Sequence, residues 1–244
     1  MRVSVASDVG RVRAGNEDNY CVIDLRPAWE GNLYAVADGM GGYEAGEVAS
    51  ALAVLTLVDR VREGMSAEPQ ADPEVVLRDA VFGADQAIFA EAQRRGVSGM
   101  GTTLTVALVG RGKVRWAHVG DSRAYLLGSG GILQLTDDHS LVGEMVRNGS
   151  LSEREAMVHP QRNILTNALG TGGLSRVDTG STEPAADDLL VLCTDGLTNL
   201  VAKEEIQALL ADRSDLDGAA RRLTELANER GGHDNITVLV VELS

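Results

Sequence analysis

The sequence predicts an α+β fold that combines antiparallel strands with long helices. Three strand-like segments open the chain, two long helical segments follow, and four short strands come next. Of the 244 residues, 44% are apolar but only 3% are aromatic, so Val, Leu and Ala must fill the interior, as they do where sheets and helices pack in layers. The length fits one large domain or two small ones, and the composition forces no division.

The first half of the chain contains three predicted strands and two predicted helices. Strand patterns occupy residues 2–8, 19–25 and 32–38, and helical patterns occupy 44–62 and 73–95. The third strand is a nearly continuous apolar run that ends at Asp38-Gly39. The segment 64–73 is polar and contains two prolines, so it is predicted to be a loop that joins the helices rather than two domains.

The second half of the chain contains shorter elements. Gly-containing turns separate predicted strands at 102–110, 113–120, 123–128 and 131–136, with later elements at 140–148, 189–194, 203–211, 216–230 and 236–243. The four consecutive strands are predicted to form an antiparallel meander. Ser152 followed by Glu155 predicts a capping box that opens a short helix. The loose segment 159–173 is a candidate lid.

Charge and cysteine content narrow the class of protein. The formal net charge of −14 repels phosphate backbones and anionic lipid, so we expect no nucleic-acid partner. The two cysteines, Cys21 and Cys193, lie far apart and form no zinc-type cluster, which fits a reduced setting. The N-terminus turns polar too early for a secretory signal, and no stretch approaches the length of a membrane span. We therefore expect a cytoplasmic monomer without a membrane anchor.

Four apolar segments each adjoin an aspartate: Asp38, Asp121, Asp195 and Asp234. If these strands lie side by side, the carboxylates converge on one edge, where such close like charges require cations between them. Asp-Gly is a common turn dipeptide, but three of the four interrupt apolar segments, where an unpaired buried charge would be costly. Oxygen ligands favour Mg²⁺ or Mn²⁺, because the four histidines lack zinc-like spacing. His118 and His233 are therefore expected to be structural.

A paired divalent site indicates hydrolysis of a phosphate ester, because two metals polarise the phosphoryl oxygens and activate a bridging water. Other phosphate chemistries have less support. The sequence has no G-x-x-x-x-G-K-[ST] or G-x-S-x-G motif, and its cysteines do not fit the C-x₅-R spacing of a cysteine phosphatase. The run at 39–42 is not a dinucleotide fingerprint, because Glu44 stands where the third glycine is required.

Seven motifs, in order, resemble those of the bacterial type 2C, metal-dependent Ser/Thr protein phosphatases. They are RVRAGNED (11–18), VADGMGG (36–42), GEVAS (46–50), GMGTTL (99–104), HVGDSR (118–123), CTDGL (193–197) and GGHDNITV (231–238). The resemblance covers essentially the whole chain. It implies a four-layer αββα sandwich of two antiparallel sheets flanked by helices, forming one catalytic domain over 1–244 with a flap at about 146–175.

The resemblance also assigns metal ligands. Asp38 resembles the carboxylate that bridges two metals, and the Gly39 carbonyl joins one of them. Asp195 and Asp234 complete the coordination of the other metal. Asp121, with Asp195, resembles the pair that holds a weaker third metal.

Further residues would support the ligands or the substrate. Glu17 and Asp18 resemble an acidic pair that acts largely through metal-bound waters. We therefore include Asp18 among the metal ligands and expect Glu17 to support them without contacting a metal. Asn235 is also expected beside the ligands rather than on a metal. Arg13 resembles the arginine that clamps the substrate phosphate, where a guanidinium fork fits two phosphoryl oxygens.

The sequence departs from the family pattern at three positions. Met40 and Tyr43 stand where other members carry histidine, so the proton donor to the leaving alkoxide is unassigned, and a metal-bound water and Tyr43 are the candidates. Asn199 stands where some members carry a further Asp near the third metal. Its neutral oxygen predicts weaker binding of that ion.

The resemblance implies that a metal-bridging hydroxide attacks phosphoserine or phosphothreonine directly, without a phosphoenzyme. The implied partners are a Ser/Thr kinase and its phosphorylated targets. Two alternatives stay open: a non-catalytic relative that binds phosphoproteins, and a metal hydrolase that acts on other phosphate esters.

Overall fold

The computed structural model describes residues 2–41, 45–67, 70–213 and 215–243, which form two compact units. Unit 1 comprises Met1–Asn16, Gly120–Asn167 and Ala185–Ser244, and unit 2 comprises Glu17–Val119 and Ala168–Pro184. Each unit contains one antiparallel sheet, with helices packed against it. The predicted α+β class with two antiparallel sheets and flanking helices is therefore confirmed.

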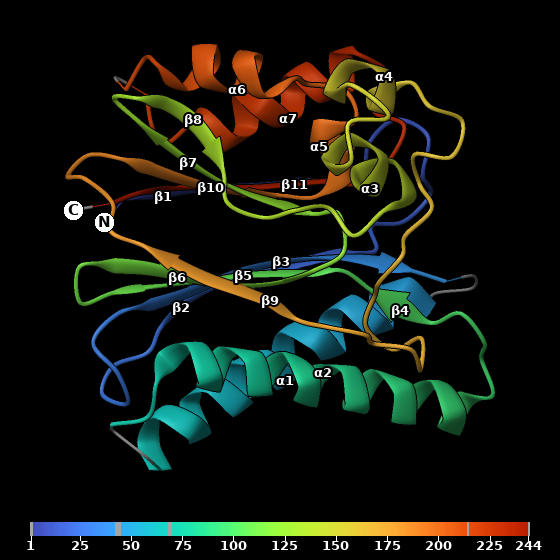
Figure 1. The fold of residues 1–244 in the computed structure, drawn as a ribbon, viewed down its shortest axis with the longest axis vertical. Coiled ribbons are helices and arrows are strands. Elements are labelled where there is room, and N and C mark those ends of the chain that lie inside the picture. The colour runs from blue at the N-terminus through green and yellow to red at the C-terminus, as the bar shows by residue number, and fades with distance from the viewer. Residues whose placement is uncertain (1, 42–44, 68–69, 214, 244) are drawn as a thin grey trace. The chain divides into compact units, whose positions relative to one another are not determined.

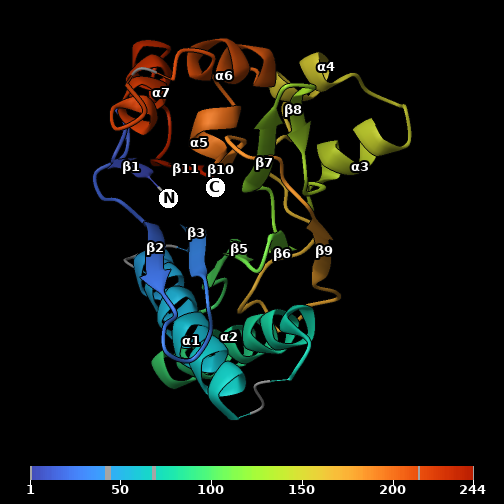
Figure 2. The same cartoon turned by 90° about the vertical axis from the view of Figure 1, so that its left-hand side faces the viewer.

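Unit 2 is built on a sheet with the strand order β2-β3-β5-β6-β9. Its strands are β2 (Asp18–Asp24), β3 (Asn32–Met40), β5 (Leu104–Gly110), β6 (Lys113–Val119) and β9 (Asp178–Thr182), and the short β4 (Gly101–Thr102) pairs with the end of β3. The helices α1 (Ala45–Ala67) and α2 (Pro73–Arg95) lie against this sheet (Figure 2). Their small and aliphatic side chains form one buried core with the strands, as the near-absence of aromatic residues requires.

Local sequence signals explain the limits of α2. Asp72 accepts a hydrogen bond from the Glu74 N–H group, and Pro73 occupies the first turn, where its missing N–H group costs nothing. The helix ends at Gly96, whose φ of 66° is the left-handed conformation that glycine adopts easily. The predicted bounds of α2 are thus confirmed. The expected start of the first helix at Glu44 lies outside the described residues.

Unit 1 is built on a sheet with the strand order β1-β11-β10-β7-β8. Its strands are β1 (Val3–Asp8), β7 (Arg123–Gly128), β8 (Gly131–Gln134), β10 (Leu189–Cys193) and β11 (Ile236–Glu242). Three helices, α5 (Asp195–Thr198), α6 (Lys203–Leu210) and α7 (Ala219–Glu229), lie on this sheet (Figure 1) and share its buried core. The strand and helix patterns expected for the end of the chain are confirmed.

Two short helices, α3 (Leu141–Arg147) and α4 (Glu153–Met157), belong to unit 1 as well. Ser140 caps α3 by accepting the Gly143 N–H group, and Ser152 with Glu155 forms the expected capping box at α4. No residue of α4 is buried. The predicted flap at 146–175 is divided at Asn167, because its last residues belong to unit 2.

The predicted meander of four consecutive strands is wrong. β5 and β6 form a hairpin in unit 2, whereas β7 and β8 form a hairpin in unit 1. The chain leaves one sheet for the other at Gly120, whose φ of 111° favours glycine. The sequence pattern also missed β9, which is polar, and α5, which has only four residues.

Candidate metal and phosphate site

Three of the predicted ligands gather at one edge of the unit 1 sheet. Cys193, the last residue of β10, pairs with Val238 on one side and with Arg123 on the other. The end of β10 therefore lies beside the beginnings of β11 and β7. Asp195 follows β10, and Asp234 and Asp121 precede β11 and β7, respectively, at this same edge.

Asp195 occupies the first turn of α5, and the structure excludes a simple Asp-Gly turn there. A β-carbon on Gly196 would collide with the carbonyl oxygen of Asn235, so glycine is required by close backbone approach rather than by a positive φ. The Asn199 amide donates to Asp195 Oδ2 at 2.9 Å. Asn199 thus supports Asp195 by hydrogen bonding, at the position where the family resemblance suggested a weaker metal ligand.

Asp234 is joined to Arg13 and to the loop that carries it. Arg13 Nη2 lies 2.7 Å from Asp234 Oδ2, and the side chains of both are partly exposed. The Asn235 amide donates to the carbonyl oxygens of Val9 and Gly15, both at 2.9 Å. Asn235 therefore holds the loop around Arg13 in place, which fits a supporting role beside the ligands.

Asp121 is buried close to other carboxylates. Burial, followed by the negative charges of Asp195 and Asp138, raises the pKa of Asp121 well above its usual range. A carboxylate in this position is stabilised by a cation, because a positive ion offsets both the desolvation and the repulsion. Asp121 is therefore a buried carboxyl close to other carboxylates, not a surface turn residue, and its role as a metal ligand stays a prediction.

The sequence analysis missed the residues that position Asp121. The imidazole Nδ1 of His139 accepts a hydrogen bond from the backbone N–H group of Gly120 at 3.2 Å. The backbone N–H group of His139 donates to the Gly120 carbonyl oxygen at 2.6 Å. Asp138, the preceding residue, forms a two-pronged ion pair with Arg123, with contacts of 2.8 and 2.7 Å. The run Asp137-Asp138-His139-Ser140 was the available signal, but it lies far in sequence from the residues it supports.

The remaining predicted ligands belong to unit 2, where Asp18 and Asp38 are directly opposite each other on β2 and β3. Directly paired residues place their side chains on the same face of a sheet, about 5 Å apart at the β-carbons. Two like charges in that position destabilise a sheet unless a cation lies between them. Asp18 is also buried, which increases this cost.

The backbone of Asp38 is held by the GMGTTL segment. Its N–H group donates to Thr103 Oγ1 at 2.9 Å, and its carbonyl oxygen accepts both the Thr102 hydroxyl at 2.8 Å and the Thr103 N–H group at 2.9 Å. Pairing with β4 extends β3 through Gly39 to Met40, so Asp38-Gly39 is part of a strand and not a turn.

Gly39 and Glu17 are packed against the first turn of α1. A β-carbon on Gly39 would collide with the Gly46 carbonyl oxygen, and one on Gly46 would lie 2.5 Å from Glu17 Oε2. The Glu17 carbonyl accepts the Gly39 N–H group at 3.1 Å and the Ser50 hydroxyl at 2.6 Å. The glycines therefore let three backbone segments meet around Asp38.

The donor set fits hard divalent cations. Each unit groups carboxylates whose mutual repulsion a cation would relieve, and the set contains no thiolate and no imidazole. In the part of the chain that the structure describes, no group of three or more His, Cys, Asp or Glu side chains already has an arrangement that could hold a metal ion. The assignment of the ligands therefore stays a prediction.

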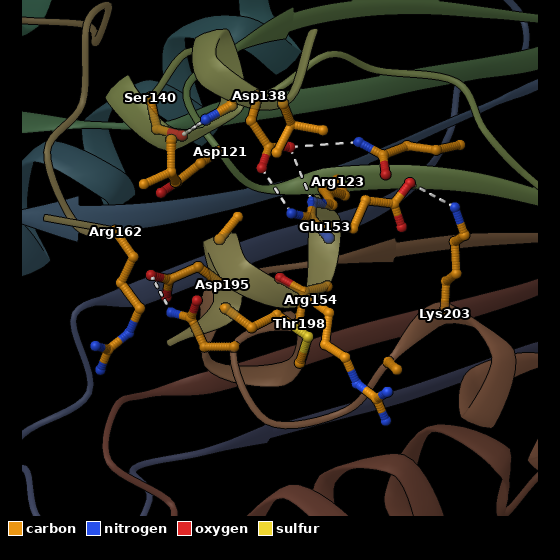
Figure 3. Close-up of a pocket in the computed structure, with 18 of the residues that line it drawn as sticks. Asp121, Arg123, Asp138, Ser140, Glu153, Arg154, Arg162, Asp195, Thr198 and Lys203 are labelled. Atoms are coloured by element: carbon orange, nitrogen blue, oxygen red, sulfur yellow. Dashed lines mark hydrogen bonds and ion pairs between the residues drawn. The ribbon is translucent and has the colours of Figure 1, made fainter. Parts of the chain in front are cut away.

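A cleft of about 690 Å³ opens beside Asp121 and Asp195 within unit 1. Figure 3 shows both aspartates with the ion pairs and hydrogen bonds that surround them. The walls come from the residues after β8, from α3 and α4, and from the segment between α5 and α6. The cleft thus connects two candidate ligands with residues of the predicted flap.

The cysteines are not suited to nucleophilic catalysis, and His118 has a structural role. Burial raises the pKa of the Cys21 thiol and of the Cys193 thiol to about 12, so neither is a nucleophile near neutral pH. His118 is fully buried, and its Nδ1 lies 2.9 Å from Thr105 Oγ1 on the neighbouring strand, as a structural histidine should. His233 is exposed.

Comparisons with known proteins agree with these observations. A family model described as Protein phosphatase 2C matches residues 14–234. The chain is 42% identical over 244 residues to the serine/threonine phosphatase stp of Listeria welshimeri, covering 99% of this chain and 96% of that protein. It is 38% identical to the serine/threonine protein phosphatase PstP of Mycobacterium tuberculosis, covering all of this chain and 45% of that protein.

Solved structures give the same result. The crystal structure of the Mycobacterium tuberculosis phosphatase PstP has a TM-score of 0.87 at 39% identity and covers 100% of this chain and 98% of that one. A structure of the PstP catalytic domain in complex with two manganese ions has a TM-score of 0.84 at 36% identity, with coverage of 100% and 98%. Within the described residues, none of the helices combines the length and apolar character needed to cross a membrane.

Proposed function

The chain belongs to the protein phosphatase 2C family and is by homology a serine/threonine protein phosphatase, and on this premise we propose that residues 1–244 form one catalytic domain that hydrolyses phosphoserine and phosphothreonine in proteins with Mn²⁺ or Mg²⁺. The observation that supports the site most strongly is the burial of Asp121 beside Asp195. A bound cation would relieve the repulsion between these two carboxylates.

We assign the ligands as the sequence suggested. Asp38, with the Gly39 carbonyl, and Asp195 and Asp234 would hold the two ions required for activity, and Asp121 would hold a third. Asp18 contributes through water. The bound ions supply an activated water and neutralise charge on the phosphoryl oxygens.

Arg13 binds the substrate phosphate. The contact between its guanidinium and Asp234 Oδ2, at 2.7 Å, supports this assignment because it holds Arg13 beside a candidate ligand. The Arg13 guanidinium could form two parallel hydrogen bonds with a phosphate dianion if a bound cation took its place at Asp234. Asn235 keeps this loop in place.

Neither of the two positions where other family members carry histidine has a described group that can donate a proton. Met40 has no ionisable proton, and Tyr43 lies outside the described residues. We therefore keep the two donors suggested by the sequence, a metal-bound water and Tyr43. A Tyr43→Phe variant distinguishes the two donors, because it changes the dependence of kcat on pH only if Tyr43 donates the proton.

The partners we propose are phosphorylated proteins and the Ser/Thr kinase that modifies them, with no nucleic acid. The excess of 36 acidic over 22 basic residues disfavours polyanionic partners in general. We also propose that the protein acts as a cytoplasmic monomer.

The test compares release of phosphate from four substrates: a phosphothreonine peptide, a phosphotyrosine peptide, a nucleotide and a phosphodiester. Each is assayed with Mn²⁺, with Mg²⁺ and with a chelator. We expect turnover of the phosphothreonine peptide only with added metal. A preference for the nucleotide or diester would indicate a different metal hydrolase, and binding of phosphopeptide without turnover would indicate a non-catalytic relative. Full turnover in the chelator would contradict the proposal.

A further inference from the structure

Asp85, on α2, is a partly buried carboxylate of unit 2 to which the proposed function gives no role. Its Oδ1 accepts the backbone N–H group of Gly170 at 2.8 Å. Within the residues that the structure describes, no lysine or arginine forms an ion pair with Asp85. The carboxylate therefore acts on the backbone of the segment 168–173 rather than on a basic side chain.

The segment around Gly170 is packed closely against α2. Leu169 and Gly170 are buried, and a β-carbon on Gly170 would collide with Ile88 Cγ2 on that helix. Because Gly170 is buried, its N–H group depends on the Asp85 carboxylate for a hydrogen-bond partner. A buried donor without a partner is costly, so removal of this carboxylate favours movement of the segment toward water.

The residue before Gly170 pairs with β4. The Leu169 N–H group donates to the Thr102 carbonyl oxygen at 3.0 Å, and the Thr102 N–H group donates to the Leu169 carbonyl oxygen at 3.2 Å. β4 has only two residues, and it also pairs with β3 at Gly39 and Met40. Because so short a strand has few hydrogen bonds of its own, the position of Thr102 depends on the segment that carries Leu169.

Thr102 in turn contacts a candidate metal ligand. Its hydroxyl donates to the carbonyl oxygen of Asp38 at 2.8 Å. A connected path of hydrogen bonds and backbone therefore leads from Asp85, through the segment 168–173 and β4, to the backbone of Asp38. Every residue on this path belongs to unit 2.

We infer that Asp85 is a positioning residue for the candidate metal site, because its bond to Gly170 holds the strand pairing that fixes the backbone of Asp38. This inference rests on the proposed function, in which Asp38 would bridge two ions. Asp85 hydrogen-bonds to the backbone of Gly170 and not to a candidate ligand, so it is not a catalytic residue. Its loss should weaken the binding of Mn²⁺ and lower kcat. The KM for a phosphopeptide should change little, since the phosphate is assigned to Arg13.

Amide hydrogen exchange in the metal-free protein, measured by NMR, tests the path directly. The reporters are the N–H groups of Leu169, Thr102 and Thr103, the last of which donates to the Asp38 carbonyl oxygen. In Asp85→Ala, we expect these groups to exchange about tenfold faster than in the wild-type protein, because the segment opens more often. Amides in the middle of β5 and β6 should keep their wild-type rates. Asp85→Asn keeps an acceptor oxygen, so its rates should stay close to those of the wild-type protein.

The matched control is Asp79→Ala, which removes an exposed carboxylate from the same helix. This control should leave all of the exchange rates unchanged. Wild-type rates at the three reporters in Asp85→Ala would overturn the inference. A rise shared equally by the amides of β5 and β6 would also overturn it, because Asp85 would then stabilise the whole unit rather than the path to Asp38.

Calorimetry with Mn²⁺ tests the consequence for the metal site. Asp85→Ala should bind Mn²⁺ about tenfold more weakly than the wild-type protein, which corresponds to about 1.4 kcal/mol, and Asp85→Asn should keep nearly the wild-type affinity. With saturating Mn²⁺, Asp85→Ala should lower kcat on a phosphothreonine peptide several-fold, with little change in KM. An unchanged affinity for Mn²⁺ in Asp85→Ala would overturn the inference, whatever the stability of the variant.

The exchange and calorimetry measurements need no turnover, so they separate this inference from the proposed function. If the wild-type protein hydrolyses no phosphopeptide but exchange and Mn²⁺ affinity respond to Asp85→Ala as expected, the phosphatase assignment is wrong and the positioning role stands. If peptides are hydrolysed but Asp85→Ala keeps the wild-type exchange rates and Mn²⁺ affinity, the positioning role is wrong and the phosphatase assignment stands.

Discussion

The two units hold their candidate ligands in different ways. In unit 2, Asp38 lies within β3, and its backbone hydrogen bonds to Thr102 and Thr103 fix it independently of any side-chain charge. In unit 1, Asp195 and Asp234 lie outside the strands, and their side chains are bonded to Asn199 and Arg13.

This difference suggests that Asp38 is a rigid candidate ligand and that Asp195 and Asp234 are adjustable ones. A strand residue with hydrogen bonds on both sides moves only if the sheet moves, so Asp38 has its geometry before any ion binds. The unit 1 carboxylates would instead have to exchange a protein partner for the cation that we propose they bind. Substitutions should therefore lower activity most at Asp38, the candidate ligand held within a strand. They should have the least effect at residues that contact no candidate ligand.

The largest effect is expected for Asp38→Asn. Neutralising the carboxylate that bridges the ions should lower kcat by more than about 100-fold, or about 2.7 kcal/mol, while circular dichroism shows a folded protein. The matched control is Asp24→Asn on the same strand pair, where an exposed carboxylate is paired with Arg26. A variant that keeps more than about a tenth of the wild-type kcat would exclude Asp38 as the bridge.

A pair of glycine substitutions compares the two units directly. In both Gly39→Ala and Gly196→Ala the new methyl group collides with a backbone carbonyl oxygen, so each should lower the free energy of unfolding by about 1–3 kcal/mol. Activity should fall further for Gly39→Ala, because the sheet around it has less freedom to shift than the single turn of α5. Gly130→Ala has nothing within 4 Å of the added methyl and serves as the control. Equal losses of activity in the two variants would remove the distinction between rigid and adjustable ligands.

A smaller effect is expected for Asp121→Ala. Removing this carboxylate leaves Asp38, Asp195 and Asp234, so calorimetry should still show two tightly bound Mn²⁺ ions, with lower turnover of phosphopeptides. Loss of one of the two tight sites would make Asp121 an essential ligand. Unchanged kcat and metal stoichiometry with a lower Tm would make it a purely structural residue.

The smallest effect is expected at a scaffold ion pair in unit 1. Hydrogen bonding to Arg230 lowers the pKa of Glu205 to about 2, below its value near 4.5 in an unfolded chain. Because the pKa is lowered in the folded state, the Glu205–Arg230 pair stabilises the fold above about pH 4.5, and this stabilisation is lost as the pH falls toward 2. Because both side chains are exposed, Glu205→Gln should lower Tm at pH 7 by only about 2 °C, and the difference should disappear near pH 2. A difference that is constant with pH would exclude the charge as its cause.

The sequence by itself determined most of the elements and the identity of the candidate ligands. Periodicity and capping residues located α1, α2 and the capped α4, because these signals act within a few residues. The strand-end aspartates were recognisable because charge is rare in apolar runs. Their assignment to particular ions came from the resemblance between seven ordered motifs and a known family.

Only the tertiary structure decided how the strands divide between sheets and what holds each ligand. Consecutive strands separated by Gly-containing turns look alike whether the next one joins the same sheet or another, so the four-strand meander was wrong. The partners of the ligands are also distant in sequence: His139 positions the turn before Asp121, and Thr102 and Thr103 hold Asp38. Such contacts depend on register and on close backbone approach, which local periodicity does not encode.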